Sequence, residues 1–200
     1  RRIRGRRIGV VFQDPMGSLS PLHRIGDQLV EAVRLHADVS KRAAREQALT
    51  WLGKVGIPDP AVRARAYPHE LSGGMQQRVM IAMALMLGPD LLIADEPTTA
   101  LDVTVQAQVL RLMRDLHRAN AAILLITHDL GVVSQMATKL AVMKAGEVVE
   151  TSDDPAAFFR APTHPYSRAL VREARKMALA GAVCGHLDEK GRKHSHGADK

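Results

Sequence analysis

The sequence predicts an α/β protein with a parallel-sheet core and a helical lobe. Three short apolar runs, at residues 8–12, 91–94 and 122–127, have the length of buried strands. Residues 18–88 instead carry apolar side chains at helical spacing, which predicts a lobe inserted between the first two strands. A helix separates the last two runs, and strand, helix and strand within about forty residues form a βαβ unit with parallel strands.

The first run, from Ile8 to Phe12, is a strand that brings Gln13 to its carboxyl end. Ser40 is the expected N-cap of the second lobe helix, which Gly56 and Pro58 end. Apolar residues predict two helices in the lobe: Ile25, Leu29, Ala32 and Val33 mark the first, and Ala44, Ala48, Leu52 and Val55 mark the second.

Asp102 is the expected N-cap of the helix in the βαβ unit. Farther along, 140–143 and 147–150 read as a hairpin, and Asp153 with Pro155 is expected to open a short helix through Phe159. A last helix starts near Pro165, and residues 181–200 are polar and are expected to be loose.

Three polar side chains are expected at one edge of the sheet, because ligands of open parallel sheets bind at the carboxyl ends of the strands. Asp95 and Glu96 follow the second run, and His128 follows the third. Phosphoryl transfer needs one acid near a magnesium ion and another that orients or deprotonates the attacking water. We assign Asp95 to the metal and Glu96 to the water. Adjacent strand residues point to opposite faces, which keeps these roles apart.

Two neutral side chains complete this edge. His128 suits a sensor of a terminal phosphate, and Gln13 offers an uncharged oxygen to magnesium or to the water. Each residue also has a plainer interpretation when taken alone. Acids at a strand end often cap the next helix, a lone histidine is commonly structural, and a lone glutamine is usually polar surface.

Ser72, Gly73 and Gly74 begin an apolar helix, whose free N–H groups and dipole predict an anion site. We expect Gln76, one turn into this helix, to be exposed to the same ligand. The alternative is a simple capped turn, since such tripeptides are common at helix starts.

Composition narrows the function classes. The net charge is +7, with basic residues gathered at both ends, but aromatic residues make up 3% of the chain, so a nucleic-acid partner is not expected. No apolar run is long enough to span a bilayer, and Cys184 is the single cysteine, which together favour a cytoplasmic location. One cysteine also argues against an iron–sulfur cluster.

These motifs together resemble the ATP-binding subunits of ABC transporters. The matching segments are Leu71 to Gln76 for the signature motif, Leu91 to Glu96 for Walker B, Ala100 to Asp102 for the D-loop, Gln13 for the Q-loop and His128 for the switch histidine. Residues 12–16, 94–104 and 163–170 are similar to the di- and oligopeptide importers, a subfamily that includes nickel importers.

The resemblance implies a P-loop NTPase-like, ABC-type fold over residues 1–170, with the helical lobe at about 18–88 and an extension at 171–200. It implies ATP and Mg²⁺ as ligands. Glu96, His128 and Gln13 would then be catalytic, and Asp95 and Gln13 would hold the metal. Nucleotide-binding residues would be Ser72, Gly73, Gly74, Gln76 and Asp102.

The family pattern also implies partners. A second ATPase subunit would pair head to tail, so that Ser72, Gly73, Gly74 and Gln76 serve the partner's nucleotide. A membrane permease would dock on the lobe and the Gln13 region, which places the chain on the inner face of the membrane.

One family element is missing from these 200 residues. The only Gly-Lys pair, Gly53-Lys54, is followed by Val55 and has the wrong spacing for a P-loop. We expect that loop upstream of Arg1, so the chain reads as a domain truncated at its amino terminus and unable to hydrolyse ATP alone. The alternative is an inactive fragment, or a non-transport ABC ATPase, that acts as an interaction module.

Overall fold

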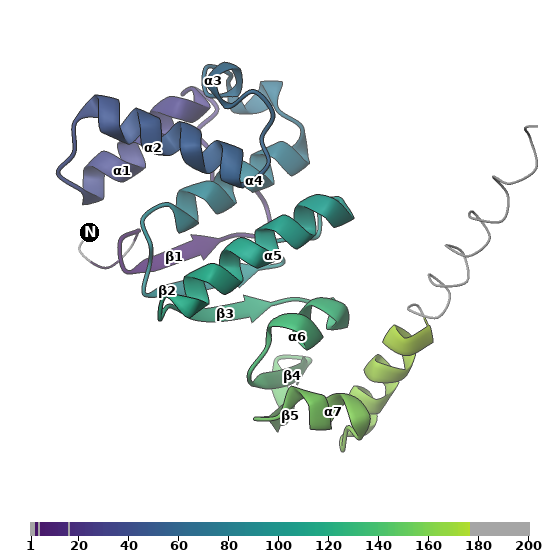
Figure 1. Cartoon of the computed structure of the whole chain (residues 1–200). Helices are drawn as coiled ribbons and strands as arrows, with labels where there is room; N and C mark the ends of the chain where they lie inside the picture. Colours follow the sequence, from purple (N-terminus) through teal and green to yellow (C-terminus); the bar gives the residue numbers. More distant parts are fainter. Residues whose placement is uncertain (1–2, 4, 16, 177–200) are drawn as a thin grey trace, which may run out of the picture. The chain divides into compact units, whose positions relative to one another are not determined.

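The computed structural model describes residues 3, 5–15 and 17–176. The chain divides into two compact units, Arg1–His128 and Asp129–Lys200. Their elements are labelled in Figure 1. The first unit ends at His128, whereas the partial domain predicted from the sequence ends at residue 170. The tail expected to be loose, 181–200, lies outside the described residues.

The first unit contains the predicted parallel sheet. Its strands are β1 (Ile8–Val11), β2 (Leu91–Asp95) and β3 (Ala122–Ile126), in the order β1-β2-β3. The register aligns Val11 with Ala94 and Asp95 with Ile126, so all three strands end at the same edge. This confirms the three strands and their parallel pairing. In the part of the chain that the structure describes, β3 pairs only with β2.

Two helices cover the sheet, α4 (Gly73–Leu85) against β1 and α5 (Val103–Arg118) against β3. The approach of α4 requires a glycine in β1, because a Cβ at Gly9 would lie 2.8 Å from the Ala84 carbonyl oxygen. The expected cap of α5 is confirmed, since the Val105 N–H donates to Asp102 at 3.0 Å. The apolar side chains buried between these elements include Val11, Leu92, Ala94, Val79, Ile81, Leu85, Val109 and Met113.

The helical lobe of this unit comprises α1 (Ile25–His36), α2 (Lys41–Lys54), α3 (Pro60–Arg63) and the 3-10 turn η1 (Pro68–Glu70). Ser40 caps α2 as predicted, accepting from the Ala43 N–H at 3.1 Å. The helices α1 and α2 pack together through the predicted apolar positions, and Ile25, Leu29, Val33, Ala44, Ala48 and Leu52 are all buried.

The second unit contains α6 (Leu130–Met136), the hairpin strands β4 (Leu140–Lys144) and β5 (Glu147–Ser152), and α7 (Pro155–Arg160). Residues 165–176 are helical, as predicted. Both turn residues of the hairpin have positive φ, 51° at Ala145 and 85° at Gly146, which matches the twist of the two strands. The helix α6 was not predicted from the sequence.

The predicted cap of α7 is wrong by one residue. Asp154, and not Asp153, accepts a hydrogen bond from the Ala157 N–H, at 3.1 Å. Asp153 is instead paired with Lys139 at 2.9 Å. No helix in the described residues combines the length and apolar character needed to cross a membrane.

Glu150 of β5 holds the segment that leads into the last helix. Its carboxylate accepts from the Thr163 N–H and hydroxyl, both at 2.8 Å, and from the His164 N–H at 2.9 Å. Burial raises the pKa of Glu150, but donors outweigh it and lower the pKa to about 2. The buried Ser167 hydroxyl also contributes to lowering this pKa, although its geometry falls short of a hydrogen bond.

We expect Glu150→Gln to destabilise the second unit by roughly 2 kcal/mol, because charged acceptors make the stronger hydrogen bonds. The lowered pKa makes the ionised carboxylate stabilising above pH 4.5, and this contribution is lost as the pH falls from 4.5 towards 2. Urea unfolding at several pH values, followed by far-ultraviolet circular dichroism, measures both effects. Glu147→Gln on the same strand, at an exposed position, is the control, and an equal loss in both variants would contradict the assignment.

Candidate functional site

The parallel register brings the predicted residues to one edge of the sheet. Val11 lies opposite Ala94, so Gln13 follows β1 at the level where Glu96 follows β2. The partner of Asp95 is Ile126, which places His128 just beyond the end of β3. The predicted convergence of Glu96 and His128 is therefore confirmed by the backbone alone.

Side-chain contacts make these residues one hydrogen-bonded cluster. His128 Nδ1 lies 2.9 Å from Glu96 Oε1, and Gln13 Nε2 donates to Glu96 Oε2 at 3.4 Å. A third donor, the Thr99 hydroxyl, lies 3.1 Å from the same Oε2. We call Gln13, Glu96, Thr99 and His128 the edge cluster. The Glu96 side chain is 23% exposed and that of His128 is 71% exposed, so the cluster remains open to a ligand.

Glu96 itself adopts an unusual backbone conformation, with φ at +45°. A non-glycine residue in the left-handed region marks local strain that the surroundings must hold in place. Here the Glu96 N–H donates to the Ile126 carbonyl at 2.9 Å, immediately after β2 ends at Asp95. Strand alternation is therefore not what separates the two acids. A sharp turn after Asp95 aims the Glu96 carboxylate at the edge cluster.

The donors around Glu96 keep its carboxylate ionised. Its pKa lies below the ordinary value, first because of the hydrogen bond from His128 and then because of that from Thr99, while burial acts in the opposite direction. An ionised carboxylate can only accept hydrogen bonds, so the Nδ1 atom of His128 carries the proton between them.

Asp95, the predicted metal ligand, is half-buried at the last position of β2. It takes no part in the edge cluster. Its carboxylate and the Gln13 amide oxygen are donors of the type that Mg²⁺ prefers. The described residues contain no group of three acidic, histidine or cysteine side chains placed to hold a metal. Mg²⁺ usually keeps several water ligands and is bound through one or two protein carboxylates.

The start of α4 is a capped helix terminus with an open approach. Ser72 caps it, accepting from the Met75 N–H at 3.3 Å. Gly73 has open space where a Cβ would stand, and a Cβ at Gly74 would lie 3.0 Å from the Ala100 carbonyl oxygen. The N–H groups of Gly73 and Gly74 have no carbonyl partner within the helix. Both the capped turn and the anion site are compatible with this geometry.

The prediction that Gln76 is exposed is wrong. Gln76 is 7% exposed, and its amide donates to the carbonyl oxygens of Pro68 at 2.9 Å and Leu71 at 3.2 Å. Almost every face of α4 is covered, so a polar residue in its first turn is buried along with its apolar neighbours. Its assignment to the nucleotide stays a prediction that the geometry of this chain does not support.

Two further side chains of α4 reach other loops. Gln77, 1% exposed, donates to the Pro97 carbonyl at 3.1 Å, next to Glu96. Arg78 donates to the Gly56 carbonyl at 2.7 Å, in the loop after α2. The predicted nucleotide-binding helix is therefore attached directly to the loop that carries the predicted catalytic acid.

Comparison with known proteins places this geometry in a family. Residues 1–99 match the family model described as ABC transporter. The dipeptide transport ATP-binding protein DppD of Bacillus subtilis is 50% identical over 189 residues, which cover 94% of this chain and 56% of that protein. DppD of Escherichia coli (strain K12) is 50% identical over 197 residues, with 94% and 60% covered. A probable peptide ABC transporter ATP-binding protein of Sinorhizobium fredii is 57% identical over 193 residues, with 92% and 57% covered.

Among solved structures, the ATP-binding cassette MJ0796 in a dimeric, post-hydrolysis state with ADP and phosphate is 30% identical to this chain. The TM-score is 0.68, with 74% of this chain and 63% of that one covered.

The chain belongs to the ABC ATPase family.

The predicted fold class, an ABC-type α/β domain, is confirmed by this structural likeness. The chain spans 56% to 60% of the length of the curated relatives named above.

Two residues of this ABC ATPase chain, Thr99 and Gln77, were not predicted from the sequence as part of the site. Thr99 lies three residues after Glu96, where the turn brings its hydroxyl back to the carboxylate. Gln77 lies between Gln76 and Arg78 in the first turns of α4, and its burial follows from the packing of that helix, so no local sequence signal marks its partner.

We expect His128→Ala to raise the pKa of Glu96 towards 4.5, because the hydrogen bond from His128 is the largest cause of its depression. A carboxyl carbon NMR titration of Glu96 measures the change. Thr99→Val removes the next donor and should raise the pKa by less. An unchanged pKa in the histidine variant would show that the 2.9 Å contact does not persist in solution.

Proposed function

We propose that this chain is part of the ATP-binding subunit of an importer, which hydrolyses ATP to drive uptake of di- or oligopeptides or related solutes. The observation that carries the proposal is the edge cluster, in which Gln13, Glu96 and His128 from three strand ends meet through hydrogen bonds. The solute class is supported by relatives of 50% to 57% identity whose names refer to dipeptide or peptide transport.

In this proposal Glu96 acts on the attacking water. Its three donors hold the carboxylate ionised, and the lowered pKa makes it a weak base while His128 remains bonded to it. When a terminal phosphate arrives, His128 turns towards that phosphate and leaves Glu96. Loss of the main donor raises the basicity of Glu96 at the moment when it must accept a proton from water.

Asp95 and the Gln13 amide would hold a magnesium ion, which neutralises charge on the phosphate oxygens. Gln13 donates its amide N–H to Glu96 and thereby leaves its oxygen for the metal or the water. This one side chain would connect the metal ligand set to the catalytic acid.

The partner assignments rest on exposed features of the first unit. Ser72 and Gly73 are exposed at the start of α4, so a second, head-to-tail subunit could place its nucleotide there. Asp102 would contribute at the same interface. The helical lobe and the Gln13 region would receive a membrane permease, and the subunit would sit on the inner face of the membrane.

We expect Glu96→Gln in the full-length protein to lower the rate of ATP hydrolysis by about 100- to 10,000-fold, the usual contribution of a general base. A phosphate-release assay with purified protein measures this. Asp115→Asn, an exposed acid of α5 that pairs with Arg118, is the matched control and should leave the rate unchanged. Hydrolysis retained in the glutamine variant would remove Glu96 from the base role.

For the 200-residue chain alone, we expect no micromolar binding of ATP with magnesium in isothermal titration calorimetry. None of these 200 residues forms a P-loop, which would give the phosphates several backbone donors and a lysine, and each hydrogen bond to a charged group contributes about 1.5–3 kcal/mol. Micromolar binding would contradict this expectation. If the full-length protein also fails to bind ATP, the alternative of an interaction module without hydrolysis is favoured.

A further inference from the structure

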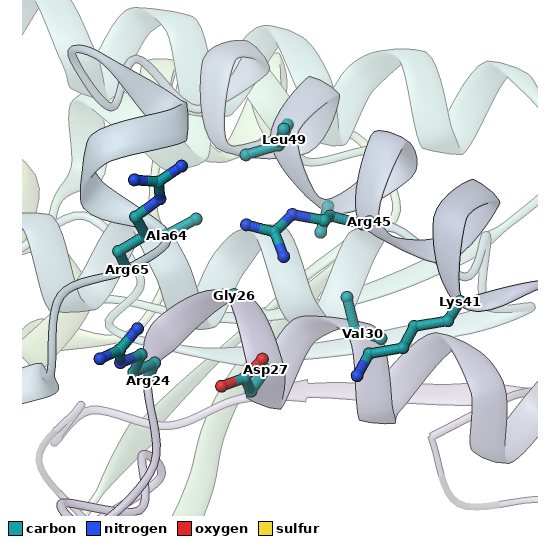
Figure 2. Close-up of a pocket in the computed structure, with 10 residues that line it drawn as sticks. Arg24, Gly26, Asp27, Val30, Lys41, Arg45, Leu49, Ala64 and Arg65 are labelled. Carbon is teal, nitrogen blue, oxygen red and sulfur yellow. The ribbon is translucent and has the colours of Figure 1, made fainter.

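A hollow in the helical lobe is lined by basic side chains from separate parts of the fold (Figure 2). Arg24 stands at the start of α1, Lys41 and Arg45 come from the first turns of α2, and Arg65 follows α3. Asp27 is the single carboxylate in the lining, so four positive charges face one negative charge, a net charge of +3.

These cations lack acidic partners within the described residues. None of Arg24, Lys41, Arg45 and Arg65 makes an ion pair there, although Arg24 lies 5.8 Å from the ring of Tyr67. On the same helix, Arg42 does pair with Glu46 at 3.0 Å, so α2 separates a neutralised face from an unneutralised one. Like charges gathered without counter-charges favour the binding of an anion.

The backbone around the hollow is fixed by short contacts. The Ile25 N–H donates to the Ala66 carbonyl at 2.9 Å, and the Gly26 N–H donates to the Ala64 carbonyl at 2.8 Å. A Cβ at Gly26 would lie 2.8 Å from that same Ala64 oxygen, so glycine is required for this approach. The start of α1 and the segment after α3, which carry Arg24 and Arg65, are therefore held together.

Apolar side chains form part of the wall. Val30 and Leu49 line the hollow between the basic residues, as Figure 2 shows. The four basic residues are themselves exposed, so an anion can reach their charges from solvent. Arginine also presents a planar fork of N–H donors that matches the oxygens of a phosphate group.

We propose that this hollow binds a phosphate group, carried either by a soluble phosphate ester or by an anionic lipid headgroup. Arg45 and Arg65 would donate to the phosphate oxygens, while Arg24 and Lys41 add charge at the rim. The net charge of +3 exceeds that of a single dianionic phosphate, so the lining can neutralise it fully. This site is separate from the edge cluster, and it does not depend on ATP hydrolysis or on peptide transport.

The test compares Arg45→Gln with Arg42→Gln in the full 200-residue chain. Both substitutions remove one charge from exposed positions of α2, but only Arg45 lines the hollow. Circular dichroism checks that both variants fold.

Two binding measurements follow. The first arm titrates inorganic phosphate at constant ionic strength and follows backbone amide NMR signals of residues 24–27, 41–45 and 64–66. The other arm measures co-flotation with phosphatidylcholine vesicles, with and without phosphatidylglycerol.

In either arm, we expect Arg45→Gln to weaken binding about fivefold or more and Arg42→Gln to change it less than about twofold. Such selectivity for inorganic phosphate identifies a soluble ester as the source. Selectivity for phosphatidylglycerol vesicles identifies a lipid headgroup. The proposal is overturned if neither probe binds, with phosphate tested to roughly 10 mM, or if both variants lose equal affinity, which is a general charge effect.

Discussion

The hydrogen-bond register of three parallel strands is the constraint on which the proposed chemistry depends. It aligns the ends of β1, β2 and β3. Glu96 therefore lies beside Gln13, which is 83 positions away in the sequence, and beside His128, which is 32 positions away. A shift of one residue in either pairing would turn Gln13 or His128 to the other face of the sheet. The buried side chains of Val11, Leu92 and Ala94 oppose such a shift, because it would expose them.

A second level of order comes from three consecutive residues of α4. Gln76, Gln77 and Arg78 each donate to backbone carbonyls in a different loop, at Pro68 and Leu71, at Pro97, and at Gly56. Each bond contributes about 1 kcal/mol, but their larger effect is on geometry. The lobe, the helix start and the loop after Glu96 share one attachment point. A displacement of the lobe would therefore act on the turn that holds Glu96 in its strained conformation.

Much of this arrangement was predictable from local patterns. The apolar runs located the strands, the parallel βαβ rule placed their ends together, and side-chain oxygens at Ser40 and Asp102 marked helix starts.

The burial of Gln76 was not predictable from periodicity, because α4 is covered on nearly all sides and has no polar face. The positive φ of Glu96 and the contact from Thr99 depend on a turn that strand alternation cannot describe. Asp153 and Asp154 are adjacent acids, and sequence alone does not choose between them as a cap. The bonds from Thr163 and His164 to Glu150 join segments 13 and 14 residues apart, beyond the range of any local rule.

The outer side of β3 has a practical consequence for the chain studied by itself. Its N–H and C=O groups on that side have no partner strand in the described residues, and the flanking Leu124 and Ile126 side chains are 53% and 48% exposed. An apolar strand with an unpaired row of backbone groups is a template for another chain. Solutions of the isolated polypeptide should thus self-associate as concentration rises, and a lysine in place of Leu124 is a rational way to keep them monomeric.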